Sequence, residues 1–181
     1  MRKLSVDEMK RVDAEQFKKL DKTPMIVVLD NIRSMNNVGS FFRTADAFRI
    51  EQLHLCGITA CPPHREITKT ALGSTESVDW HYFENILDSV HWLKENGYKV
   101  YAVEQVDTPI YLHKFEWNLS EKIAIIMGNE VFGVSDEVLP LCEGALEIPQ
   151  IGTKHSLNVS VSAGMAMWHL YAQWLNRFPN N

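Results

Sequence analysis

The sequence predicts an α/β protein with a mostly parallel sheet covered by helices on both faces. Short apolar runs alternate with segments of helical spacing, which is typical of strand–helix–strand units. Residues 25–29 and 122–127 are the clearest runs, because each is almost continuously apolar, as in a strand buried on both faces. With 181 residues, 45% apolar and 23% charged, the chain has the size and composition of one globular domain.

The first 22 residues are predicted to form a helical extension to a domain of residues 23–178. Ser5 and Glu8 have the spacing of a capping box, which indicates a single helix ending at Thr23-Pro24. A strand (25–29), a helix with apolar positions from 38 to 48, a strand (52–56) and a short basic helix (64–72) are expected next.

The second half continues this alternation. Strands are expected at 78–83, 99–103, 122–127 and 145–148, with an irregular segment at 104–121. Helices are expected from Asn85, as an N-cap, to Leu93, for a short stretch from Ser135, and over 158–177.

Composition and signatures exclude several classes. No apolar run reaches the roughly 18 residues of a membrane span and residues 1–20 are too charged for a signal peptide, so the cytoplasm is the expected location. The three cysteines lack CxxC spacing, and GxGxxG, GxxxxGK[ST], GxSxG and HExxH signatures are missing, so we expect no disulfide framework and no metal site.

Net charge is −5, which does not indicate a nucleic-acid binder, although residues 1–22 hold seven Lys/Arg against five Asp/Glu. A leading helix that touches phosphates and a solvated amphipathic helix both remain open.

Polar side chains gather where three predicted strands end. Each has a local explanation: Arg43 could pair with Asp46, Glu130 could stabilise a helix start, and Ser156 or Asn158 could cap the last helix. Because ligands bind outside the carboxyl ends of parallel strands, the same residues could instead surround one small-molecule pocket.

Three segments in this order resemble the motifs of the SpoU (TrmH-like) branch of the SPOUT RNA methyltransferases. They are Asn37-x-Gly39-x-x-x-Arg43-Thr44-Ala45, Met127-Gly128-Asn129-Glu130-x-x-Gly133 and Ile148-Pro149-x-x-Gly152-x-x-x-Ser156-Leu157-Asn158-Val159-Ser160-x-x-Ala163. The resemblance extends over roughly residues 24–174.

This resemblance implies a sheet whose C-terminal part threads through a loop as a deep trefoil knot. It implies S-adenosylmethionine bound in the knot, with its adenine held mainly by main-chain groups, and methyl transfer to a ribose 2′-hydroxyl of RNA. The matching cofactor positions are Gly128, Ile148 and Leu157, with Glu104 and Gln105 as a further wall.

The resemblance also implies the catalytic set Arg43, Asn37, Glu130, Ser156 and Asn158. Ser156 and Asn158 are expected to orient Arg43 and the ribose, while Asn37 and Glu130 hold the neighbouring loops. Arg43 is often proposed as the base in this family, but a guanidinium has a pKa above about 12. We favour the hypothesis that Arg43 grips the adjacent phosphate, and that this phosphate or a water accepts the proton.

The partners implied by the resemblance are RNA and a second copy of the chain. The helix over 158–177 has more large apolar residues than one buried face needs, which suits a homodimer, and a fully buried core helix is the alternative. RNA contacts are expected from Arg33, Arg49, His64, Arg65, Lys69, Lys154 and His155.

For the substrate we favour tRNA over ribosomal RNA, because the chain has a TrmH-like leading helix and no separate RNA-binding domain. The same chemistry on ribosomal RNA, a non-catalytic knotted RNA-binding relative, and a methyltransferase for a small molecule or protein are the alternatives.

Overall fold

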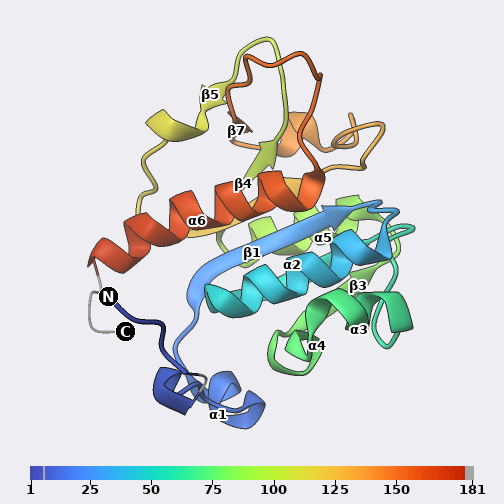
Figure 1. Ribbon diagram of the computed structural model, residues 1–181. Helices are drawn as coiled ribbons and strands as arrows, with labels where there is room; N and C mark the ends of the chain where they lie inside the picture. The colour runs from blue at the N-terminus through green and yellow to red at the C-terminus, as the bar shows by residue number, and fades with distance from the viewer. Residues whose placement is uncertain (6, 178–181) are drawn as a thin grey trace.

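A parallel sheet runs through the centre of the computed structural model, which describes residues 1–5 and 7–177 (Figure 1). In this part of the chain the sheet has seven strands in the order β3-β2-β1-β6-β4-β7-β5, and every neighbouring pair is parallel. The strands are β1 (Thr23–Asp30), β2 (Ile50–Cys56), β3 (Trp80–Phe83), β4 (Tyr98–Val103), β5 (Ile110–Tyr111), β6 (Lys122–Met127) and β7 (Gly144–Glu147). The predicted α/β class is confirmed.

Helices cover both faces of the sheet, as predicted. In Figure 1, α2 and α6 lie side by side in front of β1, and α5 lies behind the sheet. Their bounds, with those of two short helices near α2, are α2 (Met35–Ala47), α3 (Arg65–Ala71), α4 (Ser74–Ser77), α5 (Ile86–Glu95) and α6 (Val159–Arg177).

Successive residues of the central strands face opposite cores. Met25, Val27 and Leu29 of β1 belong to the core under α2 and α6, whereas Ile26 and Val28 belong to the core under α5. Because both faces of β1 are dry, its sequence is a continuous apolar run with no polar alternation.

The N-terminal segment contains two short helices where one was predicted. The capping box forms, since Ser5 N donates to Glu8 Oε2 at 2.8 Å and Glu8 N donates to Ser5 Oγ at 3.4 Å. Lys10 then adopts a left-handed φ of 47°, which interrupts a right-handed helix, and Asp13 caps a second one. These helices are η1 (Asp7–Met9) and α1 (Ala14–Lys19). The predicted boundary after residue 22 stays a prediction, and the predicted domain end at residue 178 lies outside the described residues.

Two further local predictions were wrong. Ser135 does not start an α-helix, because its N–H donates to the buried carboxylate of Asp30 at 2.7 Å, and turns with a 3-10 helix, η3 (Leu139–Leu141), follow. The segment 104–121 is not wholly irregular, since it contains β5 and η2 (Leu112–Lys114). The caps at Asn85 and Asn158 are confirmed, because Asn85 Oδ1 accepts from Leu87 N at 2.8 Å and Asn158 Oδ1 from Ser160 N at 3.0 Å.

The strand order places β7 between β4 and β5, two strands that are close in the chain. The C-terminal part of the chain therefore enters between segments that precede it. This placement is compatible with the predicted trefoil knot, whose threading stays a prediction.

Candidate functional site

A cleft of about 540 Å³ opens outside the carboxyl ends of β4, β6 and β7. Its walls come from the loops that follow these three strands, which is where ligands bind in parallel sheets. All the positions predicted to bind the cofactor line it: Gly128, Ile148, Leu157, Glu104 and Gln105.

The loop after β6 is a tight turn that only glycine permits at its start. A Cβ on Gly128 would clash with the backbone of Gly133 and Val134. Asn129 and Gly133 exchange two backbone hydrogen bonds of 2.9 Å, and Asn129 Oδ1 accepts from the N–H groups of Val131 and Phe132 at 2.9 and 3.2 Å. The turn is therefore rigid.

Glu104 and Gln105 join the walls of the cleft to each other. Glu104 Oε2 accepts from Val134 N at 2.9 Å, and Oε1 accepts from Gln105 N at 2.8 Å. Gln105 Nε2 donates to the carbonyl of His155 at 2.8 Å. The loop after β4 is thus tied to the loops after β6 and β7.

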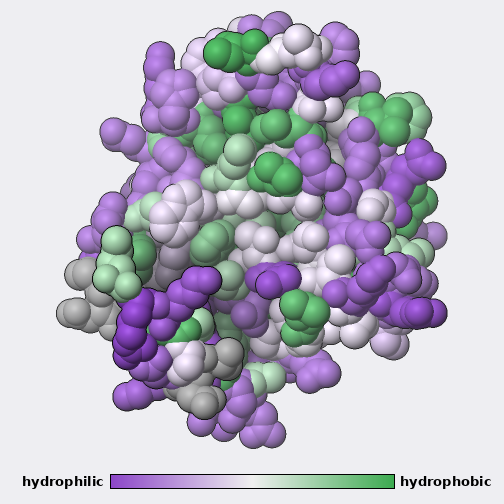
Figure 2. Space-filling view, viewed as in Figure 1, coloured by the Kyte–Doolittle hydropathy of each residue, from purple (hydrophilic) through white to green (hydrophobic). Residues whose placement is uncertain are grey.

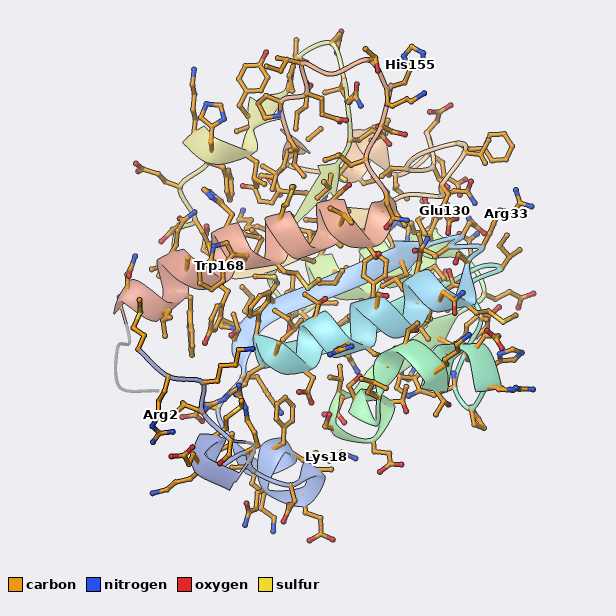
Figure 3. The ribbon with its side chains drawn as sticks, in the orientation of Figure 1. Arg2, Lys18, Arg33, Glu130, His155 and Trp168 are labelled. Carbon is orange, nitrogen blue, oxygen red and sulfur yellow. The ribbon has the colours of Figure 1, made fainter. Side chains whose placement is uncertain are left out.

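Glu130 links the loop after β6 to the start of α2. Its carboxylate accepts from Arg33 N and Ser34 N at 2.9 Å each and from Asn37 Nδ2 at 3.0 Å (Figure 3). Burial alone would raise the pKa of Glu130, but these hydrogen bonds outweigh it and the pKa is lowered from its ordinary value. The carboxylate is therefore held in its charged form.

Asn37 extends this connection to α6. Its Oδ1 accepts from Asn158 Nδ2 at 3.2 Å and from Ser160 Oγ at 3.4 Å. The three sequence motifs, which come from α2, the loop after β6 and the start of α6, are thus joined by one chain of hydrogen bonds, Glu130–Asn37–Asn158. Ser156, the remaining partner expected beside Asn158, is exposed and lines the cleft.

Arg43 does not line the cleft. It lies six residues beyond Asn37, about 9 Å further along α2. Its side chain is exposed and forms no salt bridge within residues 1–5 and 7–177, so the predicted pair with Asp46 is not formed. Asp46 instead accepts a hydrogen bond from Ser77 Oγ.

Six of the predicted RNA-contacting residues are exposed, Arg49 is half-buried, and they do not all lie on one edge of the sheet. Arg33 projects beside Glu130, and His155 lies on the loop after β7 (Figure 3). Arg65, Lys69 and Lys154 are also exposed, whereas His64 caps α3 by accepting from Glu66 N at 3.2 Å. Arg49 directly precedes β2 and so lies at the opposite, amino edge of the sheet.

Sequence reasoning missed two polar residues that build the site. Asp30, fully buried at the end of β1, accepts from Ser135 N, and Asn129 Nδ2 donates to the carbonyl of Asn31 at 2.6 Å. Asp30 ends β1 and Asn129 is the second residue after β6, so the available signal was their position at the ends of strongly apolar strands.

The cleft suits a small organic cation with an apolar part. Its volume is within the range of about 300–1,000 Å³ of small-molecule sites. Met127, Ile148 and Leu157 supply apolar surface, and the carboxylates of Glu104 and Glu147 favour positive charge. Within the described residues no group of three or more His, Cys, Asp or Glu could hold a metal ion, and no helix there is long and apolar enough to cross a membrane.

The signature of the SpoU rRNA Methylase family matches residues 24–168. The chain belongs to this family. A tRNA (guanosine(18)-2′-O)-methyltransferase of Thermus thermophilus is 29% identical over 168 residues, which are 93% of this chain and 84% of that one. The 23S rRNA (guanosine-2′-O-)-methyltransferase RlmB of Neisseria meningitidis is 30% identical over 82% of this chain, but this match spans only 58% of that protein.

Solved structures of the SpoU family share this fold. An AdoMet-bound rRNA methyltransferase from Sinorhizobium meliloti superposes with a TM-score of 0.78 at 25% identity, covering 86% of this chain and 59% of that one. The predicted family is confirmed, and the parallel sheet covered by helices is the fold that this chain shares with the solved methyltransferase.

Proposed function

We propose that this SpoU protein transfers the methyl group of S-adenosylmethionine to a ribose 2′-hydroxyl of a tRNA. The reaction class and the cofactor follow from its family, whose relatives are named 2′-O-methyltransferases and include an AdoMet-bound structure. The observation that carries the assignment is the hydrogen-bonded chain Glu130–Asn37–Asn158 beside a cleft that fits the cofactor.

The choice of tRNA rests on how much of this chain each relative matches. The tRNA-specific relative aligns with 168 residues, whereas the family signature spans only residues 24–168 and the rRNA-specific relative aligns with 148 residues. The tRNA enzyme is therefore similar to this chain beyond the common domain. Unmodified tRNA in the cytoplasm is the substrate that this proposal names.

Positioning is the main contribution of the protein to the reaction. The bound cofactor supplies an electrophilic methyl group on a sulfonium. The main-chain groups at Gly128, Ile148 and Leu157 would hold the adenine end in the cleft. The fixed loops orient the attacking hydroxyl, and correct orientation can contribute up to roughly 7–11 kcal/mol. Arg43 binds the phosphate next to the reacting ribose, and that phosphate or a water takes the hydroxyl proton, because guanidinium groups do not act as bases in proteins.

In a homodimer, Arg43 of one protomer could reach the cleft of the other protomer, although it does not reach the cleft of its own. Val161, Met165 and Trp168 of α6 are 48%, 45% and 53% exposed and lie on one side of the helix, so the predicted alternative of a fully buried helix is wrong. Figure 2 shows apolar and neutral residues across the middle of the face that carries α6 and α2. We propose this face as the subunit interface, across which Arg43 of one protomer reaches the cleft of the other.

The test is methyl transfer from radiolabelled S-adenosylmethionine to unmodified total tRNA and, separately, to unmodified ribosomal RNA, followed by nucleoside mapping. The proposal predicts label in a 2′-O-methylated nucleoside of tRNA. Label only in ribosomal RNA would contradict the substrate, and label on a base would contradict the reaction. A folded protein that gives no heat with S-adenosylmethionine in titration calorimetry would instead be a non-catalytic RNA-binding relative.

A further inference from the structure

A second hollow, of about 450 Å³, lies on the other side of the loop 129–136 from the cofactor cleft. The two share one wall, because several residues of this loop line both. The shared residues are Asn129, Phe132, Gly133, Val134 and Asp136. A ligand in the second hollow would therefore lie next to one in the cofactor cleft.

Phe132 is the most prominent residue of the shared wall. Its side chain is 85% exposed, although the turn that carries it is closed by the hydrogen bonds between Asn129 and Gly133 and by the cap from Asn129 Oδ1. The hydrogen-bonded backbone of the turn therefore keeps the ring of Phe132 exposed to solvent. An exposed aromatic ring on a rigid turn is already arranged for a flat apolar partner and loses little entropy on binding one.

Asn31 holds the opposite wall of the hollow at a fixed separation. Its Oδ1 accepts from Ile58 N at 3.1 Å, and its carbonyl accepts from Asn129 Nδ2 at 2.6 Å. Ile58 is 66% exposed and lines the hollow opposite the loop of Phe132. Through these two hydrogen bonds, Asn31 connects the backbone of Ile58 to the loop that carries Phe132.

Charge at the rim indicates what would fill this space. Arg33 lines the hollow, and only its backbone N–H has a hydrogen bond among the described residues, so its guanidinium is available to an anion. Figure 3 shows Arg33 projecting from the edge of the molecule beside Glu130. Asp136, also on the rim, offers an acceptor for an exocyclic amine. A flat ring, a phosphate and an amino group together are the features of a nucleotide.

We infer that the second hollow binds a nucleobase of the RNA substrate, stacked on Phe132, while Arg33 binds a phosphate of the same strand. The inference rests on the proposed function and deepens it by naming where the RNA is held. RNA-binding proteins recognise unpaired bases by stacking them on aromatic side chains, and each such stack strengthens binding substantially. The shared wall places this base next to the ribose that is methylated.

The test compares Phe132→Ala, Phe132→Leu and Phe132→Tyr in methyl transfer to unmodified total tRNA. Stacking predicts that the Ala and Leu variants raise the KM for RNA about tenfold or more, since leucine is apolar but has no π-face. The Tyr variant stays within about threefold of the wild type for the same reason. Tyr111→Ala is the matched control, because Tyr111 is an exposed aromatic residue of β5 that lines neither hollow.

Two further measurements separate this inference from the proposed function. Because Phe132 also lines the cofactor cleft, the first is titration calorimetry of each Phe132 variant with S-adenosylmethionine. Heat of binding shows that the variant is folded, and a loss of cofactor affinity as large as the rise in KM for RNA would overturn the stacking inference. Arg33→Ala should weaken RNA retention on filters and lower the slope of log K against log salt by about one.

The stacking inference would be overturned if Phe132→Ala had the KM for RNA of the wild type, or if Phe132→Leu and Phe132→Tyr had the same KM for RNA. The proposed methyl transfer would not be affected by either result. A wild-type chain that binds the cofactor but neither retains nor methylates RNA would overturn the proposed function and this inference with it.

Discussion

The side-chain amide of Asn37 both donates and accepts hydrogen bonds. Nδ2 donates to Glu130 and Oδ1 accepts from Asn158 and Ser160, so one residue of α2 connects the loop after β6 to the start of α6. A carboxylate cannot replace this amide, because it accepts hydrogen bonds but cannot donate one. A methyl group cannot replace it either, because it neither donates nor accepts.

Asn37→Asp should therefore destabilise the protein and reduce methyl transfer. The new carboxylate would face that of Glu130, and we expect a loss of about 1–3 kcal/mol in the free energy of unfolding. Urea denaturation measures this loss. Asn36→Asp is the control, since it makes the same charge change at the neighbouring exposed position. Equal losses in the two variants would show that the network does not matter.

Glu130 predicts how this stability depends on pH. Its pKa is lowered from the ordinary value of 4.5, so its contribution is complete above that value and is lost as the pH falls through the lower folded pKa. Glu130→Gln should cost about 1–3 kcal/mol at neutral pH, because Arg33 N and Ser34 N donate to different oxygens of the carboxylate and one of these becomes an NH₂ group, which cannot accept. In urea denaturation the difference between wild type and variant should narrow well below pH 4.5. If the stability difference between wild type and Glu130→Gln were the same at neutral pH and well below pH 4.5, this role of the Glu130 carboxylate would be contradicted.

At the scale of elements, the site depends on how α2 is fixed between its neighbours. α6 contacts one side of α2 and α3 the other, and α3 approaches so closely that a Cβ on Gly39 would clash with Thr70 Oγ1 and the carbonyl of Ile67. This contact orients α2, and hence Asn37, toward Glu130 and Asn158.

Gly39→Ala should destabilise the protein by about 1–3 kcal/mol, because α3 must move away from α2. Gly164→Ala in α6, where a Cβ meets nothing within 4 Å, should be neutral or stabilise by up to about 1 kcal/mol. Thermal unfolding of the two variants measures both effects. A Gly39→Ala protein as stable as the wild type would show that the close approach is not required.

Element by element, the sequence was informative where the signal is local or apolar. The run 122–127 and the cap at Asn158 were predictable, because burial on both faces and capping leave direct marks in the sequence. The helix break at Lys10 was not predictable, because it depends on the left-handed backbone of that residue. The turn after Ser135 was not predictable either, because it depends on the carboxylate of Asp30, which is far away in the sequence. The convergence of Asn37, Glu130 and Asn158 came from the resemblance and not from spacing.

At the scale of the whole molecule, one protomer carries a cofactor cleft and leaves Arg43 outside it. The exposed apolar stripe on α6 provides the surface that would join two such protomers. The position of Arg43 outside the cleft of its own chain could not be predicted from the sequence, because it depends on how α2 packs against the loops that form the cleft.

Met165→Lys should separate the dimer into monomers in light scattering, because it places a charge at the centre of the proposed interface. Binding of S-adenosylmethionine should persist if the cleft is built within one protomer, while methyl transfer should be lost. Met9→Lys is the matched control, since Met9 is also 45% exposed but belongs to η1. A Met165→Lys protein that stays dimeric would show that the interface lies elsewhere.

The most direct measurement is the activity of a heterodimer made from two inactive chains and purified with two different tags. One chain carries Arg43→Ala and the other carries Leu157→Arg, which blocks the cleft with a cation. If Arg43 acts across the interface, one of the two sites is complete, and the heterodimer should have about half of the wild-type activity. A heterodimer as inactive as the two parent homodimers would contradict a site shared between protomers.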